Sequence, residues 1–392
     1  MSKQSQVKYR CRGCGKQFQI LGDLQRHILV KHHQKGDIPN DEVVVHNMNK
    51  IGYWAAQEQY SLSQLLEFVV EAEKGGFTTM MTSDHFHPWW HYNAFGNFTW
   101  VWIAAAAERT KKMQFITGVT APIYRYHPVI IAQAFASLDV IYPGRIGLGL
   151  GTGEAMNEAP LGFDWPRAKA RLARTKEAIH IIKQLWNHDG INEGFVNFNG
   201  ENFLVRDAKL YTLPVSSIPL YMAATGQQAV RIAAKYSDGL ITHLNPDEAG
   251  RLLETFDKTV QKTCDSNIQK PKIAEYKVSF SDDYDSALKS TYFWRATLLK
   301  NVFDSDISDP RKLQKKALKE VSDDQLKESI DIVTSVEDCI TSIEKYFKAG
   351  FTTVYVHSTS PDEIRFVKEF SKKVLPYFAG RIAEERPTAS AS

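Results

Sequence analysis

Residues 77–91 read FTTMMTSDHFHPWWH, a short β-rich run that passes directly into aspartate, histidine and tryptophan. An amphipathic stretch at 63–76, SQLLEFVVEAEKGG, comes before it and closes on two glycines, as helices often do. From Met48 onward the same alternation recurs, with short β-rich runs separated by helical stretches of ten or more residues. This pattern predicts a parallel sheet whose strands are joined by crossover helices.

The β-rich runs number eight, which favours a closed barrel over an open sheet. We expect strands at residues 49–56, 77–84, 113–121, 145–151, 218–224, 238–243, 272–280 and 352–358, and a long helix at 167–186. The segment 281–335, between the last two strands, is too long for a bare loop, so helices are expected at 309–321 and 322–333, over the barrel mouth. The predicted fold class is α/β, a (β/α)8 TIM barrel over 48–384 with a helical insertion before the last strand, followed by a tail at 385–392.

A separate metal-binding pattern lies near the N-terminus. Cys11 and Cys14, then a gap of twelve residues, then His27 and His32, have the spacing of four tetrahedral zinc ligands, and His33 could replace His32. Apolar residues at 9, 18 and 24 fit the small core of a ββα unit. Residues 1–36 therefore resemble a C2H2 zinc finger holding structural Zn²⁺, with 37–47 as a linker, although chance spacing remains the alternative.

Charge is divided unevenly between this head and the rest of the chain. Residues 1–36 carry +7, so the other 356 residues carry −4, because the whole chain of 392 carries +3. An acidic body argues against a broad nucleic-acid surface. The base-reading positions of the finger would be Ile20, Asp23 and Arg26, of which the first two suit bases poorly. Weak nucleic-acid contact, protein contact and a purely stabilising role all stay open for the finger.

Composition places the chain among globular proteins. Hydrophobic residues make up 43% of it, which is enough for one large core or two medium ones. No apolar run is long enough to span a bilayer, and the first residues lack the apolar stretch of a secretory signal, so no membrane partner is expected and the cytoplasm is the expected compartment. The remaining cysteines, Cys264 and Cys339, are expected to be reduced.

In a barrel of this kind, chemistry gathers at the C-terminal ends of the strands. The first and second predicted strands lead to Glu58 and to Asp84, His85 and Trp89, a set suited to proton transfer. A glutamate is more often a solvated surface charge, and His85 could be a structural histidine. Other residues at predicted strand ends are Gly118, Val119, Glu154, Asn157, Glu158 and the turn Ala224, Thr225 and Gly226.

Several nucleotide and nucleophile motifs are missing from the sequence. There is no GxxxxGK[ST] loop and no nucleophile elbow, and GLGLGTG at 147–153 is not followed by the acidic ribose ligand of a dinucleotide-binding fold. We therefore do not expect a nicotinamide domain.

Long ordered stretches from about Ile51 to Arg381 resemble the luciferase-like barrel family that uses coenzyme F420, a deazaflavin, and most of all its glucose-6-phosphate dehydrogenases. The stretches are GYWAAQEQ, SDHFHPWWH, YRYHPVIIAQAFASLDVIYPGRIGLGLGTGEAMNE, RLARTKEAI, IPLYMAATG and YSDGLI. The resemblance implies a dehydrogenase that transfers a hydride from an alcohol or sugar CH–OH group to oxidised F420. We also expect the chain to form a homodimer.

The resemblance further implies a role for each site residue. His85 would be the general base, Asp84 would orient it and contact the deazaflavin, and Glu154 would be an acid near the ring nitrogen. Trp89 and Glu58 would shape the substrate side. The remaining cofactor contacts would be Gly118 and Val119, joined by a cis peptide bond, with Asn157, Ala224, Thr225 and Gly226.

The chain departs from the family where sugar-phosphate enzymes clamp their phosphate with three cations. Only Lys277 matches, since the other two positions fall on Tyr292 and near Asn245 or Pro246. We therefore expect a neutral alcohol or an unphosphorylated sugar as substrate. The alternatives are a methylene-tetrahydromethanopterin reductase-like activity, an FMN-dependent monooxygenase, and, in another class, a zinc-finger nucleic-acid or protein-binding factor with an inactive barrel.

Overall fold

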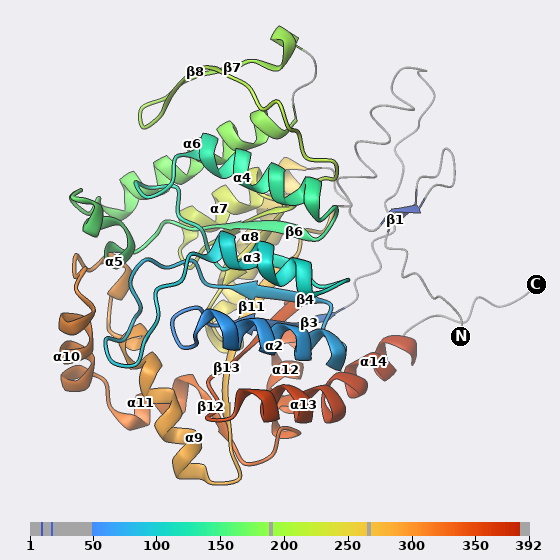
Figure 1. The fold of residues 1–392 in the computed structure, drawn as a ribbon, viewed down its shortest axis with the longest axis vertical. Helices are drawn as coiled ribbons and strands as arrows, with labels where there is room; N and C mark the ends of the chain where they lie inside the picture. The colour runs from blue at the N-terminus through green and yellow to red at the C-terminus, as the bar shows by residue number, and fades with distance from the viewer. Residues whose placement is uncertain (1–8, 11–16, 19–48, 188–190, 265–267, 385–392) are drawn as a thin grey trace, which may run out of the picture.

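The computed structural model describes residues 9–10, 17–18, 49–187, 191–264 and 268–384. Within these ranges eight parallel strands close into a barrel, because β10 pairs with both β9 and β11 and so completes the ring (Figure 1). The strands are β3 (Lys50–Ala55), β4 (Thr79–Thr82), β5 (Gln114–Thr117), β6 (Ile146–Leu150), β9 (Leu220–Ala223), β10 (Gly239–Thr242), β11 (Lys272–Phe280) and β13 (Thr353–Ser358). All eight lie where the sequence predicts strands, which confirms the barrel.

Helices connect consecutive barrel strands and cover the outside of the ring. The first begins at the Ser61 capping box and ends at Gly76, whose φ of 107° is left-handed and favours glycine. The long helix predicted at 167–186 is present as α6. The helices are α2 (Leu62–Gly75), α3 (Thr99–Arg109), α4 (Pro128–Ile141), α6 (Ala168–Trp186), α7 (Gln227–Tyr236), α8 (Pro246–Thr263), α12 (Asp338–Lys348), α13 (Glu363–Lys373) and α14 (Leu375–Glu384).

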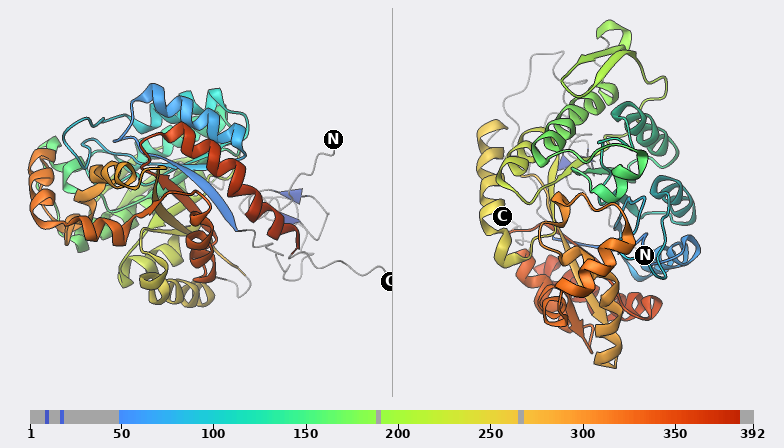
Figure 2. Two further views of the ribbon diagram at one scale, coloured as in Figure 1. Left: turned by 90° about the horizontal axis from the view of Figure 1, so that it is seen from below. Right: turned by 90° about the vertical axis from the view of Figure 1, so that its left-hand side faces the viewer.

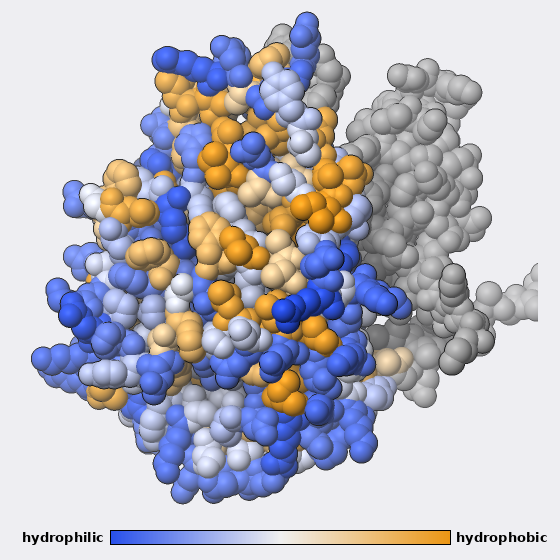
Figure 3. Space-filling view, viewed as in Figure 1, coloured by the Kyte–Doolittle hydropathy of each residue, from blue (hydrophilic) through white to orange (hydrophobic). Residues whose placement is uncertain are grey.

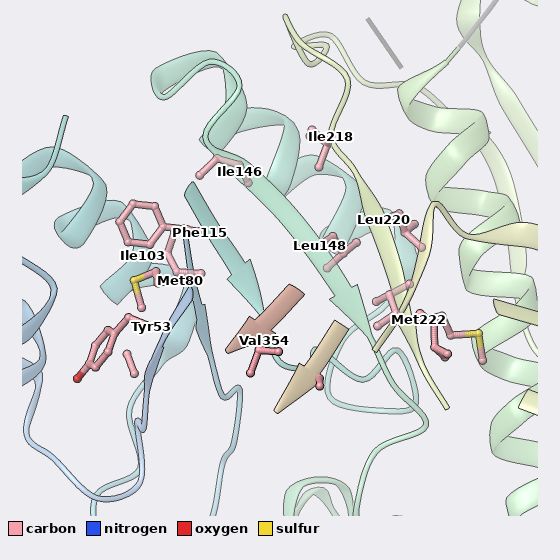
Figure 4. Close-up of a cluster of buried hydrophobic side chains, with 14 of the residues drawn as sticks. Tyr53, Met80, Ile103, Phe115, Ile146, Leu148, Ile218, Leu220, Met222 and Val354 are labelled. Carbon is pink, nitrogen blue, oxygen red and sulfur yellow. The ribbon is translucent and has the colours of Figure 1, made fainter. Parts of the chain in front are cut away.

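Successive side chains of a strand point to opposite faces, and this alternation divides the buried apolar side chains of the barrel into an outer and an inner layer. In β6 the sequence IGLGL sends Ile146 and Leu148 into the shell between strands and helices, where they pack with residues such as Phe115 (Figure 4). A Cβ on Gly149 would lie 2.0 Å from the Thr117 carbonyl oxygen, so the inner side of β6 has no room for a side chain. A second layer contains one side chain from each of six strands: Trp54, Met81, Ile116, Ile241, Ile273 and Tyr355.

The insertion before the last strand lies across the end at which the barrel strands terminate (Figure 2). Its side chains contact that end directly, since the Phe303 and Trp89 rings are 5.9 Å apart and Trp294 Nε1 donates to Gln59 Oε1 at 2.9 Å. This confirms the expected placement over the mouth. The insertion contains α9 (Tyr284–Ser290), η4 (Thr291–Leu298), η5 (Val302–Asp304), α10 (Pro310–Glu320) and α11 (Asp323–Ser329).

One part of the insertion differs from the expectation. The second predicted helix, 322–333, ends at Ser329, and Asp331–Val333 forms the strand β12 instead. This strand pairs in parallel with Val278–Phe280, the end of β11, which extends past the barrel and offers free backbone groups. A hairpin between α6 and β9 was not predicted from the sequence either. It consists of β7 (Val196–Asn199) and β8 (Leu204–Ala208).

The predicted zinc ligands Cys11, Cys14, His27 and His32 lie outside the described residues, as do the linker at 37–47 and the tail at 385–392. Two short described strands from the head, β1 (Tyr9–Arg10) and β2 (Gln17–Phe18), pair in antiparallel fashion. In the part of the chain that the structure describes, no helix is both long enough and apolar enough to cross a membrane.

A buried carboxyl group joins the first barrel strand to the last helices. Glu363 begins α13 and is only 3% exposed, and the Tyr53 hydroxyl donates to its Oε1 at 2.9 Å. Burial raises the pKa of Glu363 to about 8, against the opposing effect of hydrogen bonds from Ser358 and Tyr53. The carboxyl group is therefore protonated in the folded protein at neutral pH and below.

Because unfolding returns Glu363 to an ordinary pKa, the folded state binds an extra proton between about pH 4.5 and 8. This group's contribution to stability is present at low pH and is lost as the pH rises, by at most about 1.4 kcal/mol per unit. We expect Glu363→Gln, which stays neutral, to unfold less readily than the unmodified protein at pH 9 and to show a flatter pH profile in chemical denaturation. The exposed Glu67→Gln is the control, and parallel profiles for Glu363→Gln and the unmodified protein would contradict the assignment.

Candidate active site

Five of the predicted residues meet at the C-terminal ends of β3, β4 and β6. Glu58 follows β3, while Asp84 and His85 follow β4. Glu154 and Asn157 belong to the turn after β6 that contains the short helix α5 (Ala155–Glu158). The closed barrel brings these three turns together, because parallel strands end on the same rim.

Glu58 and His85 form a buried pair. Glu58 Oε1 lies 3.1 Å from His85 Nδ1, and the two side chains are 1% and 9% exposed. The Ser83 hydroxyl donates to the other oxygen, Glu58 Oε2, at 2.5 Å, which fixes the carboxylate. The Trp89 ring lies 5.7 Å from the imidazole. Glu58, expected on the substrate side, is therefore the carboxylate that contacts His85.

The resemblance implies that Asp84 orients His85, but the contacts of the Asp84 carboxylate are with residues of the loop after β5. Its Oδ1 accepts from Arg125 at 2.8 Å and from the Tyr126 hydroxyl at 3.2 Å, and its Oδ2 accepts from Thr120 at 2.6 Å. Arg125 also donates to the Asp84 carbonyl oxygen at 2.6 Å. The carboxylate nearest to the His85 imidazole is thus that of Glu58, because the Asp84 carboxylate is held on the side of the β5 turn.

Arg125 is in turn held by a residue that sequence reasoning weighed as a surface charge. Glu158 is fully buried, and its Oε2 accepts from the backbone N–H groups of Tyr124 and Arg125 at 2.8 and 2.7 Å. Burial raises the pKa of Glu158, while the two N–H groups and Arg125 oppose the rise. This carboxyl group fixes the loop from which Arg125 reaches Asp84.

Asn157 links the β6 turn to the β4 turn. Its Nδ2 donates to Glu154 Oε2 at 3.0 Å, and its Oδ1 accepts from the backbone N–H of Phe86 at 2.8 Å. Both groups of the amide are used, so it holds Glu154 beside the loop that carries Asp84 and His85. Unlike Glu58 and Glu158, Glu154 is partly exposed and can meet a ligand.

Two further backbone features lie at neighbouring strand ends. The peptide bond between Gly118 and Val119 is cis, as the resemblance implies. The turn of Ala224, Thr225 and Gly226 leads directly into α7, and a Cβ placed on Gly226 would meet nothing within 4 Å. The first N–H groups of a helix lack partners within the helix, so this open turn is suited to an anion.

Lys277 lies on β11 and has both a carboxylate and an aromatic ring as neighbours. Its Nζ is 3.2 Å from Glu275 Oε1 and 5.7 Å from the centre of the Trp294 ring. The same Glu275 oxygen lies 2.6 Å from Nδ1 of His357, on the adjacent strand β13. Sequence reasoning missed Glu275. The sequence feature that could have identified Glu275 is its spacing from Lys277. Residues two apart on a strand lie on the same face, so Glu275 lies on the same face of β11 as Lys277.

Aromatic side chains join the His85 region to the insertion and to β10. The Trp89 ring contacts both His85 and Phe303, and the Phe303 ring lies 5.3 Å from His243. On the other side, the His357 ring lies 4.4 Å from Trp294 and is stacked 5.3 Å from Trp54. The charged groups therefore stand in mostly apolar surroundings, which strengthens electrostatic interactions.

This arrangement is suited to proton transfer at the strand ends. With Nδ1 facing Glu58, His85 has Nε2 left to receive a proton, and Glu58 can stabilise the resulting imidazolium. Among the residues that the structure describes, no group of three or more histidine, cysteine or acidic side chains could hold a metal ion.

Comparison with known proteins identifies a family. The family model described as luciferase-like monooxygenase matches residues 42–353, most of the chain. F420-dependent glucose-6-phosphate dehydrogenases of Microbacterium testaceum and Intrasporangium calvum are each 34% identical to this chain. The alignments span 337 and 339 residues, 85% of this chain and 98% and 100% of those proteins.

Solved structures are similar as well. An F420-dependent secondary alcohol dehydrogenase in complex with an F420–acetone adduct superposes with a TM-score of 0.78 at 34% identity, covering 83% of this chain and 98% of that one. The coenzyme F420-dependent tetrahydromethanopterin reductase from Methanopyrus kandleri gives a TM-score of 0.68 at 21% identity, covering 84% and 99%. The second similarity supports the fold alone.

The buried contact between Asp84 and Arg125 can be tested by its stability. Asp84→Asn keeps the side-chain shape but removes the carboxylate that is ion-paired with Arg125, which is 10% exposed. Loss of one partner from a buried pair costs about 3–5 kcal/mol, so we expect the free energy of unfolding to fall by about 3 kcal/mol. Chemical denaturation measures this, with the exposed Asp164→Asn as control at about 0.5 kcal/mol or less. Equal losses in the two variants would contradict the pairing.

Proposed function

The chain belongs to the luciferase-like family, and we propose on that basis that it is an F420-dependent dehydrogenase acting on CH–OH donors. It would transfer a hydride from an alcohol or sugar to oxidised coenzyme F420. The observation that carries the proposal is the buried pair of Glu58 and His85, 3.1 Å apart, beside Asp84 at the strand ends. The names of the 34% identical relatives and of the secondary alcohol dehydrogenase structure support it.

Bound F420 supplies the two-electron acceptor for the hydride. The chain supplies the base, because a hydride leaves carbon most easily as the hydroxyl on that carbon loses its proton. We assign that proton to His85 Nε2, with Glu58 stabilising the cation through Nδ1. Trp89, next to the imidazole, would pack against the substrate and exclude water.

The residues present fit the cofactor. Asp84 is fixed by Arg125 and Thr120 and can contact the deazaflavin, while the partly exposed Glu154 can serve as the acid near the ring nitrogen. The backbone at Gly118 and Val119 would lie behind the ring. The cofactor tail is anionic and suits the open N-terminus of α7 at Ala224, Thr225 and Gly226, with Asn157 as a further contact.

The charges near Lys277 favour an unphosphorylated substrate. Tyr292 stands where a second phosphate-binding cation is expected, and its hydroxyl donates to Asp323 Oδ2 at 2.9 Å. The cation three residues later, Arg295, is paired with Asp323 as well. Asn245 caps α8, accepting from Glu248 N at 3.0 Å. Of these three residues only Arg295 is a cation, and it is already paired with Asp323, so a phosphate monoester would lack the two other cations of the clamp.

The N-terminal head is proposed to be an accessory. We expect Cys11, Cys14, His27 and His32 to hold one structural Zn²⁺, and the antiparallel pairing of β1 with β2 supports a ββα unit. Weak contact with nucleic acid or another protein through this head stays open. We expect deletion of residues 1–36 to remove about one zinc per chain, measured by elemental analysis, and to spare turnover. A folded but inactive truncated protein would show instead that the head takes part in catalysis.

The proposal includes a homodimer. Apolar side chains gather on the face that carries α3 and α4 (Figure 3). The large apolar residues exposed on these two helices are Val101, Ile130, Val140 and Ile141. Such patches commonly mark interfaces, and a second copy of the chain would bury them. Light scattering should return twice the mass of one chain.

The proposed function is tested by cofactor binding and then by turnover. Purified protein is titrated with F420 and with FMN, and a panel of secondary alcohols, sugars and glucose 6-phosphate is then screened for bleaching of F420. We expect F420 to bind and neutral alcohols or sugars to bleach it. Tight binding of FMN would favour a monooxygenase, and hydride exchange only with methylene-tetrahydromethanopterin would favour a reductase. No turnover with any donor would favour the binding-factor alternative.

His85→Ala should lower F420 reduction by about 10²-fold or more, because positioned acid–base groups contribute about that much, while F420 binding stays unchanged. The control is His91→Ala, an exposed histidine of the same loop whose backbone contact with Gln314 survives the substitution. Unchanged turnover in His85→Ala would overturn the assignment of the base.

A further inference from the structure

Phe303, on η5 of the insertion, lies across the mouth of the barrel. Its ring contacts the Trp89 ring at 5.9 Å and the His243 ring at 5.3 Å. Trp89 belongs to the loop after β4, whereas His243 directly follows β10. In the closed ring of eight parallel strands β4 and β10 lie on opposite sides, because three strands separate them in either direction. The Phe303 ring therefore spans the mouth, and Trp89 connects it to His85.

The segment that carries Phe303 is held through its backbone by side chains from outside the insertion. Arg171 Nη2 donates to the Phe303 carbonyl oxygen at 3.1 Å and to Asp304 Oδ1 at 2.8 Å. Further along the segment, the Ser308 carbonyl oxygen lies 3.0 Å from His87 Nδ1, and that nitrogen must carry the proton because a carbonyl only accepts. Contacts to carbonyl oxygens fix the path of the chain independently of its side chains.

Arg171 is itself fixed on α6 and shielded from water. It is 3% exposed, its Nη1 donates to the Pro166 carbonyl oxygen at 2.7 Å, and its guanidinium lies 4.4 Å from the centre of the Trp165 ring. It lies near the N-terminal end of α6, where the helix dipole disfavours a cation. The ion pair adds little, since Asp304 is 63% exposed. The contact that ties Arg171 to the insertion is therefore the one with the Phe303 carbonyl.

We propose that Arg171 is a positioning residue: by holding the backbone at Phe303 it keeps the Phe303 ring across the mouth, where the ring excludes water from the substrate side of His85. The inference rests on the proposed function, because it concerns the base of that reaction. The base has to meet the donor hydroxyl instead of a water molecule, and an apolar cover over the mouth favours the donor. Exclusion of water also strengthens the interaction of His85 with Glu58.

A purely structural role for Arg171, as an anchor between α6 and the insertion, is the competing explanation. Phe303→Ala separates the two, because it removes the ring and leaves the carbonyl oxygen that accepts from Arg171. Under the structural explanation Arg171→Met has the same effect on catalysis with and without the ring. Under the proposal the effect passes through the ring and disappears once the ring is gone, so the two substitutions are coupled.

The kinetic test measures F420 reduction by propan-2-ol and by glucose in a double-mutant cycle of Arg171→Met and Phe303→Ala. We expect Arg171→Met to lower kcat/KM about tenfold, mainly by raising KM, because the ring that it displaces lies on the substrate side. Binding of F420 should stay unchanged for the same reason. In the Phe303→Ala background, Arg171→Met should change kcat/KM by less than about twofold.

Hydrogen exchange of residues 301–308, followed by mass spectrometry on the full-length protein, tests the hold on this segment without any turnover. The amides should exchange about fivefold faster in Arg171→Met, the effect of losing one hydrogen bond. The matched control is Arg174→Met. Arg174 belongs to the same helix and also donates to a carbonyl oxygen, that of Ile123 at 2.8 Å, which is in the loop after β5. This variant should leave the exchange of residues 301–308 unchanged.

Each outcome decides the question. Unchanged exchange in Arg171→Met, unchanged kcat/KM in folded Phe303→Ala, or an equal effect of Arg171→Met in both backgrounds overturns the proposal. If Arg171→Met does not fold, Arg171→Lys replaces it, since lysine keeps the charge but loses the guanidinium fork. Failure of the proposed function would look different: the unmodified protein would reduce F420 with no donor, while hydrogen exchange would still report whether Arg171 holds the segment.

Discussion

Closure of the parallel ring by pairing of β10 with β11 is the constraint on which the candidate site depends. Parallel strands in a closed barrel all end on one rim, so residues far apart in sequence must meet there. Glu58, Asp84 and Glu154 share no local motif and become neighbours only through this geometry. The same closure places the insertion, since η4 and η5 can pack over one rim and cover the apolar rings around it.

Buried charges at this rim occur in pairs. Glu58 faces His85, Asp84 faces Arg125, and Glu275 faces Lys277. An isolated charge in such surroundings would cost several kcal/mol, so each pairing is what allows a charged group to stand away from water. The pairs also divide the rim into three parts, one around His85, one around Arg125 and one around Lys277.

The predictable part of the fold is the part set by local pattern. Each barrel strand is a short β-rich run between amphipathic helices, and that alternation can be read without tertiary information. The strand Asp331–Val333 was missed because three residues carry no periodicity, and they become a strand only where β11 offers them free backbone groups. The β7–β8 hairpin was missed as well, since its strands are short and much of its surface is exposed.

For the site, sequence by itself determined which residues stand at strand ends, because the position of a residue after a strand follows from local order along the chain. It also gave the family, through long matching stretches that include His85 and Glu154. Only the tertiary structure decided the partners: that Glu58 and not Asp84 contacts His85, that Glu158 is buried, and that Glu275 pairs with Lys277. The physical reason is that a contact between side chains depends on the distance between strands, which barrel closure sets and which spacing along the chain does not record.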